Sequence, residues 1–382
     1  MTSLNPATGE LVCVSLAAVP QELVQSRAIF RLLPRLRRMQ SPAPLAMNLP
    51  PSLCTRPPCG IRQLALRVRT AVLAIVASAS LLAAEPGRLT VTWLDMPVHG
   101  LAVVMQTPSG KTFLIDTGGV QQKDDSDYNA GRDTIAPFLT ARGITGIAGI
   151  SISHPHADHY GGASWLINNW KVGAFFDHGY EGRAQTATYT RIRALAKERG
   201  GTHRAVHHGD TLAWDDALTV EVLSPPADFL DPNSDPAKVS DHGLLNSNSV
   251  VLRVQHGANV FLFPGDCYGG TFDRYLKANV APEKLRATVL TAAHHGFNHG
   301  TVFPAIVRPQ FAVVSCVADY PGNAGTPNSR SPGDDAMKAY DALGAKVFVT
   351  AFHGNITAVS DGRSVTVTKS HERAQQPAAE KK

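Results

Sequence analysis

Cysteine is scarce in this chain of 382 residues, and only Cys267 and Cys316 of its five cysteines follow residue 84. Two cysteines so far apart make no disulfide framework, which excludes a small fold held together by disulfides. Histidine is absent from residues 1–98, although 15 histidines follow, and lysine is absent from residues 1–84. The side chains that carry chemistry are therefore separated from the N-terminal part. The composition, with 43% hydrophobic and 18% charged residues, is that of an ordinary globular protein.

The excess of positive over negative charge is confined to the N-terminal part of the chain. Residues 1–84 hold nine arginines against two acidic residues. From Glu85 onward, 27 of the 36 basic and 29 of the 31 acidic residues remain, so this part has a net charge of about −2. The overall charge of +5 therefore gives the rest of the chain no support for binding a nucleic-acid backbone.

An uncharged run near residue 80 indicates an export signal. Thr70–Ala84 is a stretch of 15 uncharged residues that follows three arginines and contains the small-residue site Ala77-Ser78-Ala79. It is shorter than the roughly 20 residues that span a bilayer, so we predict a signal peptide at 61–84, with a retained N-terminal anchor as the alternative. Residues 1–60 are then a disordered leader or a wrongly assigned start, with translation beginning at a methionine such as Met47. We expect an exported protein, periplasmic or extracellular, with no stable membrane insertion after cleavage.

Beyond Glu85, apolar runs of strand and helix character alternate. We predict strands at 89–94, 101–106, 112–115, 147–152, 172–176, 218–223, 249–254, 260–263, 287–291, 311–315, 346–350, 356–359 and 364–368. Helices are expected at 133–142, 161–170, 189–197, 271–277 and 333–343, with a loop at 225–247. This mixture without an internal linker predicts a single α/β domain over 85–370, followed by a disordered tail at 371–382.

The densest group of chemically active side chains is Ser153-His154-Pro155-His156-Ala157-Asp158-His159. It lies directly after the predicted strand 147–152 and before a helix. Neutral imidazole and carboxylate are good ligands for zinc, manganese or iron. Three histidines and an aspartate packed so closely compete with one another unless a cation joins them. The sequence therefore predicts a metal site here.

The same motif, His-x-His-x-Asp-His, resembles the signature of the metallo-β-lactamase superfamily. Within that superfamily, Leu114–Gly119, Phe263–Asp266 and Ala293–Gly296 resemble, in the same order, motifs of the metallo-β-lactamase domain of ComEC-type competence proteins. The resemblance covers about residues 89–368. It implies a four-layer αββα sandwich with metals at one edge, between the sheets.

The resemblance also implies a role for each matching residue. Two divalent metal ions, zinc or manganese, are expected, the first on His154 and His156 and the second on Asp158 and His159. Asp266 is expected to bridge the two ions. One of His294 and His295 would complete the second site and the other would face substrate; with Asp158 they form the expected catalytic set. Asp116 is expected to orient the metal loop without being a ligand.

Two departures from the family pattern affect the expected site. Where many members place another histidine ligand, this chain has the Asn-rich segment Asn246-Ser247-Asn248-Ser249, so the first metal is expected to have two histidines and the bridge, and to bind weakly. The ComEC-type motif Gly-Gln-Gly-Asp is replaced by Val98-His99-Gly100-Leu101. His99 and His178 could line the cleft, but we predict both to be local structural residues. His203, His207, His208 and His256 are predicted to be surface or turn residues.

A bound metal pair can supply hydroxide near neutral pH, so no serine or cysteine nucleophile is needed. The first expectation is hydrolysis of a phosphodiester in a small molecule or a short nucleic acid. The alternatives are hydrolysis of another ester, an amide or an envelope component, and a non-catalytic metal- or DNA-binding module. The channel segment of the competence proteins has no counterpart in the resemblance, so DNA uptake is not implied.

Overall fold

The computed structural model describes residues 3–4, 11–12, 87–121, 127–182, 186–230, 241–267, 275–297, 302–317 and 333–371. The chain divides into two compact units, Met1–Arg67 and Val68–Lys382. In the first unit, β1 (Ser3–Leu4) pairs antiparallel with β2 (Leu11–Val12). The predicted signal peptide, nearly all of the leader and the tail after His371 lie outside the described residues. In the described part of the chain, no helix combines the length and apolar character needed to cross a membrane.

Two mixed β-sheets form the second unit. The eight-stranded sheet has the order β10-β9-β8-β5-β4-β3-β17-β18, and the six-stranded sheet has the order β11-β12-β13-β14-β15-β16. The strands of the first sheet are β3 (Leu89–Trp93), β4 (Ala102–Gln106), β5 (Thr112–Thr117), β8 (Gly146–Ser151), β9 (Lys171–Asp177), β10 (Thr202–Ala205), β17 (Ile356–Ser360) and β18 (Val365–Lys369). Those of the second are β11 (Leu218–Ser224), β12 (Val251–His256), β13 (Asn259–Phe263), β14 (Val289–Thr291), β15 (Phe311–Val314) and β16 (Lys346–Val349). A two-stranded ribbon joins β6 (Val120–Gln121) to β7 (Tyr128–Asn129).

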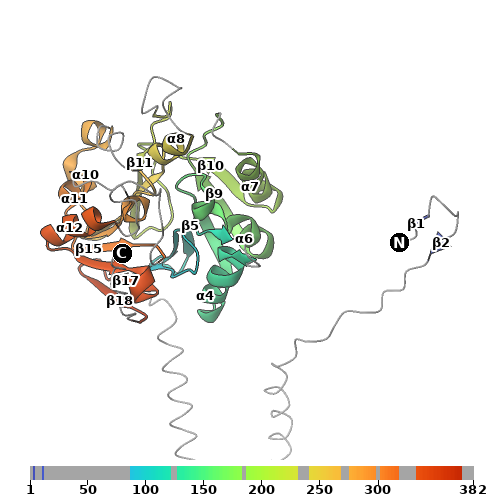
Figure 1. Ribbon diagram of the computed structural model, residues 1–382, viewed down its shortest axis with the longest axis horizontal. Helices are drawn as coiled ribbons and strands as arrows, with labels where there is room; N and C mark the ends of the chain where they lie inside the picture. Colours follow the sequence, from blue (N-terminus) through green and yellow to red (C-terminus); the bar gives the residue numbers. More distant parts are fainter. Residues whose placement is uncertain are drawn as a thin grey trace, which may run out of the picture. The chain divides into compact units, whose positions relative to one another are not determined.

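Helices cover the outer face of each sheet (Figure 1). On the first sheet these are the π-helical turn η2 (Gly131–Ile135), α4 (Ala136–Ala141), α6 (Ala163–Asn169) and α7 (Ala187–Glu198). On the second sheet they are α10 (Pro282–Leu285), α11 (Val302–Val307), α12 (Asp334–Ala342) and α13 (Thr350–His353). The short helices α5 (Ala157–Tyr160) and α8 (Asp241–Ser247) and the 3₁₀ turn η3 (Ala293–Gly296) lie in loops that follow strands or connect them.

Alternation along the strands builds three apolar cores. In β4, Val103 and Met105 belong to the core between the sheets, whereas Ala102 and Val104 pack under the helices of the first sheet. This follows from the two-residue period of a strand, which sends neighbouring side chains to opposite faces. The second sheet buries its other face in the same way beneath α10, α11 and α12. The layers are therefore helix, sheet, sheet, helix, and the predicted four-layer αββα sandwich is confirmed.

Most predicted strands and helices are present within one to three residues of their expected bounds. The predicted loop 225–247 is wrong at its C-terminal end, because α8 forms over Asp241–Ser247. Its sequence, Asp-His-Gly-Leu-Leu-Asn-Ser, has weak helix formers, but Leu244 and Leu245 are buried, so tertiary packing overrides the local preference. Most of the predicted helix 271–277 lies outside the described residues.

Candidate metal centre

The chemically active side chains gather at the carboxyl ends of four strands. In the first sheet, β5 and β8 pair in parallel, and in the second sheet β13 and β14 do so. Parallel strands end at the same edge of a sheet, where α/β proteins place their ligand sites. Asp116 lies near the end of β5, the loop His154–His159 follows β8, Asp266 follows β13, and His294 and His295 follow β14. The candidate site therefore lies between the two sheets at one edge.

Asp116 organises the loop that follows β8. Its Oδ1 accepts a hydrogen bond of 2.7 Å from the Ser153 amide, and its Oδ2 accepts one of 2.8 Å from the Ser153 hydroxyl. The same Oδ2 lies 2.8 Å from Nδ1 of His159. A proton on Nδ1 leaves the Nε2 lone pair of His159 facing the interior of the site. Asp116 is fully buried and has a backbone φ of 56°, a left-handed conformation that costs free energy and is retained mainly at functional sites.

The carboxylate of Asp266 stands between two groups of histidines. Its Oδ1 lies 3.2 Å from Nε2 of His159 and 3.6 Å from Nε2 of His295. Its Oδ2 lies 3.6 Å from Nε2 of His154 and 3.7 Å from Nε2 of His294. Each carboxylate oxygen thus faces a different pair of histidines, which is the geometry that a bridging ligand needs.

An unusual backbone turns both downstream histidines toward this carboxylate. His294 and His295 have φ values of 50° and 53°, a left-handed conformation that L-residues other than glycine rarely adopt. Nδ1 of His295 lies 2.8 Å from the carbonyl oxygen of Ser315, and Nδ1 of His294 lies 3.2 Å from that of Phe297. Both rings therefore donate through Nδ1 and present the Nε2 lone pair inward.

Two donor groups result, each with its potential ligand atoms within 4.8 Å of one another. The first group contains His154, His156 and Asp266, and the second contains Asp158, His159, Asp266 and His295. Imidazole nitrogen and carboxylate oxygen are the donors that zinc and manganese take in proteins. The residues present therefore fit a pair of divalent ions that share Asp266.

The electrostatics of the cluster reflect strong coupling between its acids and histidines. Burial alone would raise the pKa of Asp266, but His159 and His295 outweigh it and hold that pKa well below its usual range. Burial opposes the charged form of His159, yet Asp266 and Asp116 raise its pKa well above the ordinary value. For His154, burial and then the neighbouring His159 lower the pKa. A positive charge is thus favoured between the carboxylates, which is also where a cation would bind.

The structure brings together all of the ligand residues that the resemblance implied, and it separates the roles of the two adjacent histidines. His295 is buried and belongs to the second group, 3.4 Å from Asp158 Oδ2. His294 is on the side of the first group, beside Oδ2 of Asp266. Asp116 holds the loop and lies outside both donor groups, as expected of an orienting residue.

His99 lines the site, a position that the sequence offered only as the alternative to a local structural role. Its Nε2 lies 3.8 Å from Asp158 Oδ2, and its ring packs on that of His295 with 4.2 Å between centroids. Burial and the neighbouring His295 lower the pKa of His99 to about 3. The alternative, a position in the cleft, therefore holds for His99. The available sequence signal was its place in Val98-His99-Gly100-Leu101, where the ComEC-type motif is replaced.

The other histidines serve the fold. His178 is buried, and its Nδ1 accepts from the Tyr180 amide at 2.9 Å, as a local structural role requires. The surface prediction is wrong for His256, which is buried with Nδ1 3.0 Å from the Ser360 hydroxyl. His203 is partly exposed, and its Nε2 lies 3.0 Å from the buried carboxylate of Asp177.

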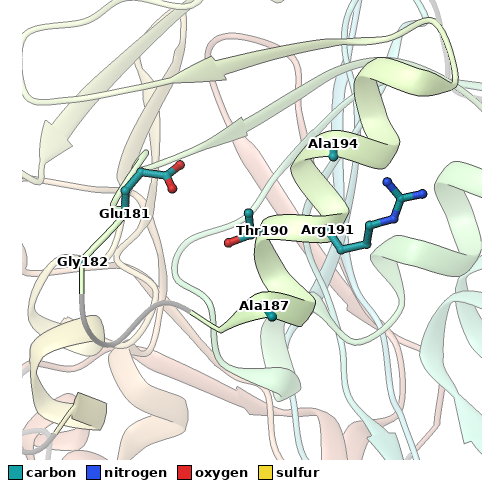
Figure 2. Close-up of a pocket in the computed structure, with 6 residues that line it drawn as sticks. All are labelled: Glu181, Gly182, Ala187, Thr190, Arg191 and Ala194. Carbon is teal, nitrogen blue, oxygen red and sulfur yellow. The ribbon is translucent and has the colours of Figure 1, made fainter.

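A surface pocket at the start of α7 is a separate feature. Figure 2 shows the six residues that line it, Glu181, Gly182, Ala187, Thr190, Arg191 and Ala194. None of them belongs to either donor group. The pocket therefore adds nothing to the candidate metal centre.

The Metallo-beta-lactamase superfamily matches residues 95–267, a range that contains the whole loop after β8 and ends just after Asp266. Residues 95–267 form a metallo-β-lactamase superfamily domain. Members of this superfamily are generally hydrolases that bind divalent metals, in agreement with the His and Asp groups described above.

Two curated proteins are similar to this chain. ComE operon protein 3 of Bacillus subtilis is 29% identical over 211 residues, which are 53% of this chain and 25% of that protein. The uncharacterized protein YcaI of Escherichia coli is 25% identical over 210 residues, 55% of this chain and 22% of that protein. The chain therefore spans a quarter or less of the length of these relatives. Among solved structures, Zn(2+)-bound PqqB from Methylobacterium extorquens aligns with a TM-score of 0.41 and 13% identity, over 67% of this chain and 86% of that one.

Proposed function

We propose that this protein is a metal-dependent hydrolase that cleaves a phosphodiester in a small molecule or a short nucleic acid. The observation that carries the proposal is the shared carboxylate of Asp266, whose two oxygens face separate groups of histidines. A pair of divalent ions held there would lower the pKa of bound water and polarise a phosphoryl oxygen. The order of motifs along the chain, which resembles that of ComEC-type proteins, supports phosphodiester over other substrates.

The residues of the site have separate roles in the proposed mechanism. His154, His156 and His159 hold the donor geometry, and Asp116 keeps the Nε2 atom of His159 directed inward. Asp158 is 30% exposed at its side chain and His294 18%, whereas His154 and His159 are fully covered. Substrate must therefore approach over Asp158 and His294.

The net charge and the N-terminal segment bear on the size of the substrate and on the location of the protein. A domain with a net charge near −2 attracts long nucleic acids weakly, so small or single-stranded phosphodiesters are favoured over duplex DNA. The arginine-flanked apolar run before Glu85 supports export to the periplasm or the medium. We propose that the exported protein works free of the membrane.

Hydrolysis of bis-p-nitrophenyl phosphate and of a single-stranded oligonucleotide, measured beside nitrocefin with manganese and with zinc, tests the proposal. We expect turnover of the phosphodiesters, and loss of that turnover in His156→Ala, which removes a ligand of the first group. His371→Ala, an exposed histidine at the end of the described domain, is the matched control and should keep full activity. Nitrocefin turnover without phosphodiester cleavage would reject the proposal.

A further inference from the structure

Asn246 lies beside the first donor group with an unused oxygen. Its side chain is 4% exposed, at the C-terminal end of α8. Nδ2 of Asn246 is 3.5 Å from Nε2 of His294, and among the described residues Oδ1 has no hydrogen-bond partner. A buried amide oxygen without a partner is destabilising, so a ligand for it is expected.

A second asparagine in the same segment shows what a structural amide looks like. Asn248 uses all of its polar atoms: Oδ1 accepts from the Leu230 amide at 2.6 Å, and Nδ2 donates to the carbonyl oxygens of Leu230 and Leu244. Asn248 therefore ties a loop to α8. Asn246 is two residues away and also buried, but no loop among the described residues donates a hydrogen bond to its Oδ1.

The backbone around Asn246 is fixed to the bridging aspartate. The Ser249 hydroxyl donates to the Asn246 carbonyl oxygen at 2.9 Å and accepts from the Asp266 amide at 3.2 Å. The amide of His294 in turn donates to the Gly265 carbonyl oxygen at 3.0 Å. One small network thus holds Asn246, Asp266 and His294 in register, as a set of ligands for one ion requires.

We propose that His294 and the Asn246 side-chain oxygen complete the first metal site together with His154, His156 and Asp266. A half-turn of the Asn246 amide brings this oxygen to the position where Nδ2 now lies 3.5 Å from Nε2 of His294. This assignment rests on the two-metal centre proposed above and gives the Asn-rich segment the place of the missing histidine. His294 Nε2 and His154 Nε2 face the same oxygen of Asp266 at 3.7 and 3.6 Å. Exchange of an imidazole for an amide oxygen makes the site weaker for zinc and better suited to manganese, because oxygen donors favour the harder ion.

Metal binding to the full-length chain, stripped by chelation and titrated separately with Mn²⁺ and Zn²⁺, tests the assignment without an activity assay. The wild type should bind two equivalents with distinct dissociation constants. Asn246→Ala should weaken the weaker Mn²⁺ site at least tenfold and leave the other unchanged. Asn246→His should tighten Zn²⁺ relative to Mn²⁺ at that site by tenfold or more. Asn246→Asp, which keeps an oxygen donor, should retain or improve Mn²⁺ binding.

Asn248→Ala is the matched control, because it removes a buried amide of the same segment that is fully bonded within the protein. It should lower the urea midpoint of unfolding and leave both Mn²⁺ dissociation constants within twofold of the wild type. Two tight equivalents with unchanged constants in Asn246→Ala and Asn246→His would overturn this assignment alone. A wild-type chain that binds neither ion would overturn the proposed function, and the assignment with it.

Discussion

At the scale of single residues, Asp116 supports the site from outside the two donor groups. One carboxylate serves the Ser153 amide, the Ser153 hydroxyl and Nδ1 of His159. In Asp116→Asn, one of the two oxygens becomes an NH₂ group that faces a donor. We expect the affinity for the second metal to fall by about 10- to 100-fold. Metal analysis after dialysis measures this, and Ser153→Ala, which keeps the carboxylate, should lose less. Unchanged affinity in Asp116→Asn would show that the His159 ring keeps its orientation without the Asp116 carboxylate.

His178 makes the stability of the fold depend on pH. Burial lowers its pKa to about 4, against the opposing effect of Asp177 and in the same direction as Arg193 and His207. Because the folded-state pKa is depressed, the unfolded chain binds a proton on His178 before the folded chain does. The folded state therefore has its full stability above pH 6.5, the unfolded pKa, and loses stability as the pH falls from there toward 4. The loss amounts to about 3 kcal/mol in total. Urea unfolding at pH 7.5 and pH 5 should show a smaller difference in His178→Leu than in the wild type; equal differences would contradict the assignment.

At the scale of elements, one buried ion pair ties α7 to the end of β9. Nε of Arg193 lies 2.5 Å from Asp177 Oδ2, with side-chain exposures of 5% and 0%. Arg193→Leu leaves the Asp177 carboxylate buried without its guanidinium partner, which should cost about 3 kcal/mol of unfolding free energy. Arg191 and Glu198 form an exposed pair on the same helix, so Arg191→Leu should change nothing measurable. Thermal or urea unfolding of the two variants compares them directly, and equal losses would refute the argument.

Periodicity is enough to predict the elements whose burial follows a regular pattern. Strands such as Ala102–Gln106 and helices such as Ala187–Glu198 have the two- and 3.6-residue patterns of their class. The helix Asp241–Ser247 has no such pattern, and the short strand Thr202–Ala205 is mostly exposed, so both escape prediction. Their structure comes from partners far away in sequence.

The same limit applies to the site. The loop His154–His159 is contiguous, so its ligands can be read from spacing alone. The choice between His294 and His295 depends on two left-handed φ values, which no spacing encodes. His99 reaches Asp158 from a different loop, and its role becomes visible only when the chain has folded.

At the scale of the whole molecule, the candidate metal centre joins the two sheets. His154 and His159 follow a strand of the first sheet, while Asp266 and His295 follow strands of the second. Bound ions should therefore stabilise the folded state by mass action, by about 2.7 kcal/mol per site at a hundredfold excess over the dissociation constant. Chelation should lower the melting temperature by about 5 °C or more. Scanning calorimetry with and without chelator measures the shift, and His371→Ala should show the same shift as the wild type. A melting temperature that changes with neither chelator nor added metal would argue against ions bound between the two sheets.

The separation of these ligands along the chain determines when during folding the protein can bind its metal ions. His154 and His295 are separated by 141 positions in sequence, and contacts of such separation are slow to form. An ion that needs ligands from both sheets is captured only after the last of these strands has docked. If the chain is exported, the ion that it carries then depends on the metal ions available in the compartment where folding ends. The metal ions of the compartment of synthesis do not decide it.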